Sequence, residues 1–293
     1  MDITKRAKLM DKFMTGVFYV VAGFFLLLLV AFAGYVIGKG FKGFTPSLLS
    51  FSEEGIGNQL FNTLYLVVLA LLISVPLGIA AGIYMAEYAK PGRFTKFLRI
   101  CIETLSSLPS IVVGLFGYLV FIVLVGARWN LMSGALAVSI LNLPLIATTT
   151  EDALRSLPKG YKQGSFGLGA THWETISKVM IPACLPRIVT GIILAAGRVF
   201  GEAAALLYTA GMSTDINWSR VWKLNSPVSP LNPFRPGETL SLHIWASRTE
   251  ALAPNAEQIA NFSAAVLLIL VFSFSIGARI LSRRIDKKMT GSK

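Results

Sequence analysis

Charged side chains are scarce in this 293-residue chain: Asp, Glu, Lys and Arg together make up 14% of it. Soluble domains carry about 25% charged residues, so the shortage argues against an ordinary soluble domain. Apolar residues reach 54%, and the mean hydropathy is +0.65. The composition therefore predicts a membrane protein.

Residues that build cross-linked or reactive sites are also few. Cys101 and Cys184 are too few for a disulfide scaffold, and His172 and His243 offer little material for a metal or catalytic centre. The sequence has no Gly-x4-Gly-Lys-Ser/Thr loop, so the chain is not expected to hydrolyse ATP by a P-loop mechanism. It also lacks a Gly-x-Ser-x-Gly elbow and paired carboxylates within its apolar runs. We therefore expect a non-catalytic chain with no cofactor of its own.

Long apolar runs are abundant, and a membrane-spanning helix needs about 20 apolar residues. Five runs without Asp, Glu, Lys or Arg reach that length: Phe13–Gly38, Gly55–Ala86, Thr104–Ala127, Trp129–Thr150 and Gln258–Ala278. A sixth run, Ile188–Gly211, is apolar but contains Arg198 and Glu202. We predict an all-α integral membrane protein with six transmembrane helices.

Lysine and arginine are distributed unequally between the two predicted sides of the membrane. Nineteen lie in the N-terminal segment, the second and fourth loops and the C-terminal tail, whereas seven lie in the opposite loops. Both termini are therefore expected in the cytoplasm. This bias accounts for most of the net charge of +12, so no nucleic-acid partner is needed to explain it.

The expected organisation follows from these spans. It consists of a cytoplasmic segment (1–12), a six-helix membrane domain (13–282) and a basic cytoplasmic tail (283–293). The membrane domain has two large loops, an internal one at 151–187 and an external one at 212–257. The external loop is rich in proline and carries Trp218, Trp222 and Trp245, a residue type suited to the membrane interface.

The internal loop contains an unusually polar stretch, LGATHWETISKVMIPA (168–183). Gly169 is expected to break the chain, and Thr171 followed by Glu174 forms the pattern of a helix-capping box. Pro182 is expected to end this helix. An apolar stripe at three- and four-residue spacing follows the cap: Trp173, Ile176, Val179 and Met180. Such an amphipathic helix either lies on lipid headgroups or docks a soluble partner.

The internal loop resembles the EAA loop of ABC-importer permeases. The resemblance rests on Gly169-Ala170-Thr171, Trp173 and Ile181-Pro182. Two other runs, LPSIVVGLFG (108–117) and RVFGEAAALL (198–207), are similar to motifs of phosphate-importer permeases. The resemblance extends over roughly residues 58–282, and it points to the A-type permease subunits of phosphate (Pst) ABC importers with their type I permease fold.

Several consequences are implied by this resemblance alone. The partners would be a second permease in a heterodimer, two copies of a cytosolic subunit that binds ATP and Mg²⁺, and an external phosphate-binding protein. The chain itself would be a multi-pass protein of the cell inner membrane. The loop would couple ATP hydrolysis to transport through eight residues: Gln163, Gly164, Ser165, Gly169, Ala170, Thr171, Trp173 and Glu174.

The chain departs from the family pattern in two places. Gln163-Gly164-Ser165 stands where the family has Glu-Ala-Ala or Glu-Ala-Ser, and Ala203 and Ala205 replace a threonine and a proline. Two alternatives also stay open. The substrate is phosphate or another oxyanion (phosphonate, sulfate or molybdate), and an ATP-independent channel or secondary transporter is the remaining class.

Arg198 and Glu202 are ionisable residues inside a predicted span. Being four residues apart, they are expected to share a helix face and to pair. One interpretation is a self-neutralising pair that helps the helix insert. In the other, Arg198 lines the translocation path and binds a passing phosphate, while Glu202 positions it and weakens its grip. Gly201, with Gly197, gives a Gly-x3-Gly spacing that allows close approach of another subunit.

Overall fold

Helices make up most of the computed structural model, which describes the chain except for residues 1–2, 43, 52–54, 214, 250–254 and 291–293. Within this part there is no β-strand. The helices are α1 (Ile3–Phe41), α2 (Gly57–Ile83), α3 (Arg93–Ser107), α4 (Ser110–Gly117), α5 (Leu131–Arg155), α6 (Lys159–Gly167), α7 (His172–Glu174), α8 (Ile181–Gly201), α9 (Ala204–Thr209), α10 (Leu240–Thr249) and α11 (Ala256–Thr290). Wider π-helical turns continue α2 to Tyr88 and α4 to Leu124, and a third joins α7 to α8.

Five helical stretches in the described part are long and apolar enough to cross a membrane. They are Arg6–Phe41, Gly57–Tyr88, Leu131–Arg155, His172–Gly201 and Ala256–Arg284. These stretches overlap the first, second, fourth, fifth and sixth predicted spans. The pair α3–α4 supplies a sixth span if its two helices are counted together.

The third predicted span, Thr104–Ala127, is wrong as a single helix. α3 ends at Ser107, α4 begins at Ser110, and the two helices bend by 101°. Leu108 and Pro109 between them have extended backbones, with ψ of 133° and 136°. The cause is local, because proline disfavours helical backbone at the residue before it and cannot donate a hydrogen bond to the preceding turn.

The centre of the bundle is built from α2, α5 and α8. Their buried side chains include Leu66, Val138 and Phe200. A Cβ atom on Gly78 of α2 would lie 2.7 Å from the Ile146 Cβ of α5, and one on Gly191 of α8 would lie 2.3 Å from the Thr149 Oγ1 of α5. Because no larger side chain fits at either glycine, α2 and α8 pack closely against α5.

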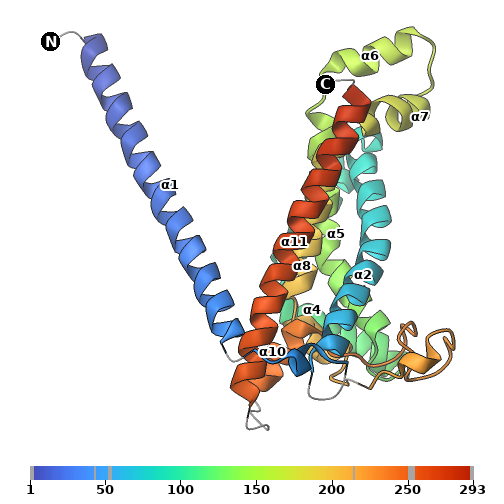
Figure 1. The fold of residues 1–293 in the computed structure, drawn as a ribbon. Coiled ribbons are helices and arrows are strands. Elements are labelled where there is room, and N and C mark those ends of the chain that lie inside the picture. Colours follow the sequence, from blue (N-terminus) through green and yellow to red (C-terminus); the bar gives the residue numbers. More distant parts are fainter. Residues whose placement is uncertain (1–2, 43, 52–54, 214, 250–254, 291–293) are drawn as a thin grey trace.

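One helix, α1, leans away from the others (Figure 1). It joins α11 at its C-terminal end only, where a Cβ on Gly40 would lie 2.3 Å from the Ala265 Cβ. There, the Lys39 Nζ also lies 3.2 Å from the Glu257 Oε1. No residue in the apolar window of α1 is buried in the described chain. Its apolar surface is therefore available to lipid or to another protein chain.

The two ends of the bundle differ in what they carry. The start of α1, the end of α11, α6 and α7 lie at one end, which we call the α6 end (Figure 1). The opposite end carries α10 and the loop that precedes it, and we call it the α10 end. Both termini therefore lie at the end that bears the predicted coupling loop.

Candidate functional site

The predicted coupling loop projects from the α6 end as two short helices joined by a turn (Figure 1). Gly169 in this turn has φ of +82°, in the left-handed region that favours glycine. The predicted capping box is confirmed. The Glu174 backbone N–H donates to the Thr171 Oγ1 at 3.3 Å, and the Thr171 N–H donates to the Glu174 Oε2 at 3.1 Å. The chain reversal and the new helix start are thus both encoded in 169–174.

The outer surface of this loop is polar but bears large apolar side chains. Trp173 is 58% exposed and Leu168 is 91% exposed, and Tyr161 and Phe166 on α6 are exposed as well. A surface of this kind is typical of a docking site. The sequence pattern indicated Trp173 but not the other three side chains, because these are isolated apolar residues that do not recur at helical spacing.

The remaining predicted coupling residues divide between surface and interior. Most are at least partly exposed: Gln163, Gly164, Gly169, Ala170, Thr171 and Glu174. Ser165 is buried, and its Oγ lies 2.9 Å from the Thr175 Oγ1, which connects α6 to the start of the long helix. Ser165 therefore supports the loop from within and does not face a partner.

The apolar stripe after the cap divides in the same way. Ile176 and Met180 are buried against Leu154 of α5 and Ile83 of α2, whereas Trp173 faces outward. The expectation that Pro182 ends this helix is wrong, because the helix runs without interruption from His172 to Gly201. Pro182 lies in the first turn of α8, where its missing N–H is tolerated by the wider turn before it.

The predicted pairing of Arg198 with Glu202 is also wrong. α8 ends at Gly201, and Glu202 has an extended backbone with ψ of 121°, so the four-residue helical spacing does not apply. The Glu202 Oε1 accepts instead from the Ala205 N–H at 3.0 Å and so caps α9. The Arg198 Nη1 donates to the Leu141 carbonyl oxygen at 3.4 Å. No carboxylate in the described chain pairs with Arg198.

The motif at 108–117 packs directly on the motif at 198–207. A Cβ on Gly114 would lie 2.7 Å from the Ala205 Cα, and one on Gly117 would lie 3.0 Å from the Thr209 Cγ2. The two glycines let the short helices α4 and α9 touch along their backbones. Gly201 differs, because a Cβ there meets no atom within 4 Å, and the same holds for Gly197. The Gly-x3-Gly surface on α8 is therefore open.

A buried polar cluster lies next to the break between α8 and α9, toward the α10 end. The Ser241 Oγ donates to the Glu202 carbonyl oxygen at 2.6 Å. The Glu238 Oε2 accepts from the Gln59 Nε2 at 3.1 Å and lies 2.9 Å from the His243 Nδ1. These contacts join α2, α10 and the residues before α9 into one unit. Polar residues at the start of a long apolar run, such as Gln59, were the available sequence signal for it.

Arg235, in the long loop before α10, belongs to the same unit. It is 1% exposed, and its Nη2 donates to the Asn62 Oδ1 at 2.5 Å and to the Pro230 carbonyl oxygen at 3.2 Å. Burial lowers the pKa of the Arg235 guanidinium to about 10, although the nearby Tyr65 opposes this shift. The side chain remains charged at neutral pH and ties the long loop to α2.

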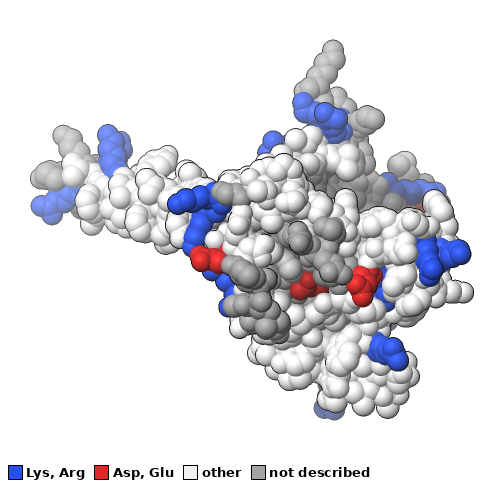
Figure 2. All heavy atoms as spheres, turned by 60° about the horizontal axis from the view of Figure 1, so that its bottom comes forward, with Lys and Arg blue, Asp and Glu red and all other residues white. Residues whose placement is uncertain are grey.

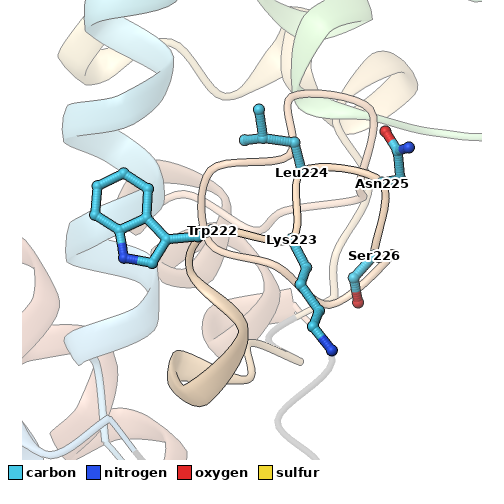
Figure 3. A pocket seen from close by; sticks show the side chains of 5 residues that line it. All are labelled: Trp222, Lys223, Leu224, Asn225 and Ser226. Carbon is cyan, nitrogen blue, oxygen red and sulfur yellow. The ribbon is translucent and has the colours of Figure 1, made fainter.

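The long loop at the α10 end also presents apolar side chains outward. Trp222 is 88% exposed and Leu224 is 56% exposed, and both line a shallow hollow with Lys223, Asn225 and Ser226. Figure 3 shows Trp222 and Lys223 projecting away from the loop. Figure 2 brings this end forward and shows a mostly uncharged surface with a few separated basic and acidic groups. The loop therefore offers an apolar contact surface on the face opposite the coupling loop.

Comparison with known proteins agrees with this architecture. A family model described as "Binding-protein-dependent transport system inner membrane component" matches residues 78–291. The Bacillus subtilis (strain 168) "Probable ABC transporter permease protein YqgI" is 46% identical, over 97% of this chain and 99% of the relative. The Xylella fastidiosa (strain 9a5c) "Phosphate transport system permease protein PstA" is 32% identical, over 85% of this chain and 84% of the relative.

Solved structures show the same fold at low sequence identity. A chain of a bacterial alginate ABC transporter, in complex with an alginate pentasaccharide-bound periplasmic protein, has a TM-score of 0.63 at 15% identity, covering 97% of this chain and 98% of that chain. A chain of the MetNI methionine ABC transporter in an inward-facing conformation has a TM-score of 0.57 at 18% identity, covering 83% of this chain and 99% of that chain. The chain therefore belongs to the family of binding-protein-dependent transport system inner membrane components, and it is a multi-pass, non-catalytic permease subunit of an ABC importer with the type I fold.

Proposed function

We propose that this permease conducts inorganic phosphate and lines the path together with a second permease. The observation that carries the proposal is Arg198, a half-exposed guanidinium in a spanning helix that has no carboxylate partner in the described chain. A charged residue at the centre of a span costs about 2.5–3.5 kcal/mol, so such residues usually mark a path or a partner. The guanidinium fork also matches the oxygens of a tetrahedral oxyanion.

Relatives support phosphate among the oxyanions. The Xylella fastidiosa relative and the Methanocaldococcus jannaschii relative, 34% identical over 81% of this chain, are both named as phosphate transport permeases. The Bacillus subtilis relative at 46% identity is named without a substrate. Sulfate, molybdate and phosphonate present similar oxygens to one arginine and form the alternative. Membership in an ABC-importer family removes the alternative of an ATP-independent channel.

The loop at the α6 end is proposed to dock on a cytosolic subunit that binds ATP and Mg²⁺, two copies of which would serve the complex. Trp173 and Leu168 provide the apolar contact, and the Gly169 turn sets the angle between α6 and α7. The excess of lysine and arginine in the N-terminal segment, the loop and the tail supports a cytoplasmic location for this end and for both termini.

The second permease is proposed to cover the apolar surfaces that this chain leaves open. α1 buries no residue of its apolar window within the described chain, and Gly197 and Gly201 leave room for a close helix. At the opposite end, Trp222 and Leu224 are proposed to contact an external phosphate-binding protein.

The test uses the complex reconstituted in proteoliposomes. Radiolabelled phosphate and the binding protein are added on the side of the α10 end, and ATP is supplied on the side of the coupling loop. We expect co-purification with a P-loop ATPase, ATP-dependent phosphate uptake, and little competition from a tenfold excess of sulfate. Loss of uptake in the presence of sulfate would assign the chain to another oxyanion. Purification without an ATPase would contradict the proposed complex.

The external surface gives a separate prediction. The binding protein is proposed to stimulate ATP hydrolysis by the complex. Trp222→Ala is expected to lower the apparent affinity of the complex for the binding protein by roughly tenfold or more, because an exposed tryptophan is a frequent interface hot spot. ATPase activity titrated with binding protein measures it. Leu72→Ala, which also removes an exposed apolar side chain but on the spanning part of α2, serves as the control. An unchanged titration for Trp222→Ala would place the contact elsewhere.

A further inference from the structure

A single carboxylate connects the coupling loop to the bundle. Glu87 lies in the π-helical turn Tyr84–Tyr88 that ends α2, and its side chain is 8% exposed. Its Oε2 accepts from the Lys162 Nζ on α6 and lies 3.0 Å from the His172 Nε2 at the start of α7. The Tyr88 ring also lies 4.9 Å from the His172 ring, between centroids. One oxygen atom therefore contacts both helices of the loop.

α7 is also held by its own continuation, because the helix from His172 to Gly201 buries Ile176 and Met180 against α5 and α2. Ser165 is the only buried residue of α6, and none of α7 is buried. The Ser165–Thr175 hydrogen bond joins the loop to its own continuation and not to α2. α6 and α7 meet at the Gly169 turn, which constrains their angle. Within the described chain, Glu87 supplies the ion pair that joins α6 directly to the end of α2.

α2 is suited to carry a displacement onward. It packs along α5 at Gly78 and Gly82, where a Cβ would lie 2.7 Å or less from atoms of α5. Farther along, Leu66 of α2 belongs to the same buried cluster as Phe200 of α8 and Leu206 of α9. A continuous, closely packed helix therefore runs from Glu87 to the region where α9 begins and where Glu202 caps it.

We propose that Glu87 is the positioning residue that fixes the coupling loop to α2 and passes the movement of the loop to the membrane path. This deepens the proposed function and rests on it. The Glu87 side chain is 8% exposed, whereas those of Lys162 and His172 are 39% and 37% exposed, so removal of Glu87 releases both partners to solvent. The charged and titratable neighbours of Glu87 include Lys162 and His172. The Glu151–Arg155 pair of α5 also lies near this end of α2, because the Arg155 Nη2 donates to the Met85 carbonyl oxygen at 2.9 Å.

A charge reversal tests this in the full reconstituted complex. Glu87→Lys is expected to lower phosphate transported per ATP hydrolysed by about tenfold, within the usual range of coupling between sites. The double variant Glu87→Lys/Lys162→Glu recreates an opposite-charge pair and is expected to restore most of the ratio. Asp11→Lys makes the same charge change on α1, at a residue with no ion-pair partner in the described chain, and should leave the ratio unchanged.

A second readout does not depend on the transported substrate. Limited trypsin digestion should cut after Lys159 faster in Glu87→Lys than in the parent protein, and the double variant should return to the parent rate. An unchanged cleavage rate and an unchanged transport ratio in Glu87→Lys, or a double variant no better than the single one, would overturn the proposal. A parent complex that binds no ATPase or transports no phosphate would contradict the proposed function instead. The trypsin comparison would then still test the role of Glu87.

Discussion

Arg198→Ala is expected to remove most phosphate uptake while leaving the assembled complex intact. The substitution removes a guanidinium that makes one long hydrogen bond in the described chain, to the Leu141 carbonyl oxygen at 3.4 Å, so little of the fold depends on it. Hydrogen bonds to a charged group contribute about 1.5–3 kcal/mol, so the loss corresponds to roughly a 10- to 100-fold fall in uptake at limiting phosphate. Radiolabelled phosphate uptake at several external concentrations measures it.

Two companion variants separate the role of Arg198 from that of its neighbour. Arg198→Lys keeps the charge but loses the planar fork, so we expect an intermediate loss of uptake. Glu202→Gln should retain uptake, because an amide oxygen still accepts from the Ala205 N–H that Glu202 now caps. A severe defect in Glu202→Gln would show that its charge matters after all. Normal uptake in a well-expressed Arg198→Ala protein would remove Arg198 from the path.

Gly169→Val and Trp173→Ala are the second pair of changes with a large expected effect. Gly169 has φ of +82°, which costs other residues roughly 1–2 kcal/mol, and more for a β-branched side chain, so valine should displace α6 relative to α7. Trp173→Ala removes an exposed side chain from the docking surface, and hot-spot losses of about 2 kcal/mol or more correspond to roughly 30-fold weaker binding. Both variants should bind the ATPase poorly and transport little phosphate per ATP.

Matched changes elsewhere isolate this effect. Gly126 also has a left-handed backbone, with φ of +69°, but it follows the helix of α4 and lies outside the loop. Gly126→Val therefore introduces comparable strain without touching the docking surface. Trp245→Ala removes a tryptophan from α10 at the opposite end. Titration of detergent-purified permease complex with the ATPase compares all four. Equal affinities for Trp173→Ala and Trp245→Ala would contradict docking through Trp173.

Much of the fold follows from the sequence because membrane spans leave a strong signal. The apolar runs located five helices, since hydrocarbon thickness sets a minimum length for each. Thr171 and Glu174 located a helix start, because a capping box depends on only four consecutive residues. These features depend on local composition and need no knowledge of what packs against them.

The breaks in the helices did not follow from the sequence. Pro109 coincides with a bend of 101°, yet Pro76, Pro144 and Pro186 lie inside helices that continue. Whether a proline breaks a helix in the membrane depends on which neighbouring groups satisfy the freed carbonyl oxygens. That information comes from tertiary contacts, such as those of Gly114 with Ala205, and these residues lie far apart in the chain.

The candidate site was predictable in its residues but not in their roles. Arg198 is conspicuous in an apolar run, but its partner was inferred from a helical spacing that ends at Gly201. The roles of Arg235 and Glu87 were not predicted, because their burial results from contacts with segments more than 70 residues away: Arg235 meets Asn62, and Glu87 meets Lys162 and His172. The periodicity of a single sequence carries no information about contacts between segments so far apart.

The leaning helix α1 also affects how its sequence is free to change. In a packed interior each side chain must match the shape of its neighbours, so exchanges among Leu, Phe and Val alter volume and destabilise the fold. Phe24 and Leu27 are 60% and 68% exposed in the described part of the chain, so they lie outside such an interior. Where α1 faces lipid, only total hydropathy and length constrain such positions, and Gly40 at its base retains a steric requirement. Amino-acid substitutions along α1 are therefore expected to accumulate rapidly at positions N-terminal to Gly40 and slowly at Gly40 itself.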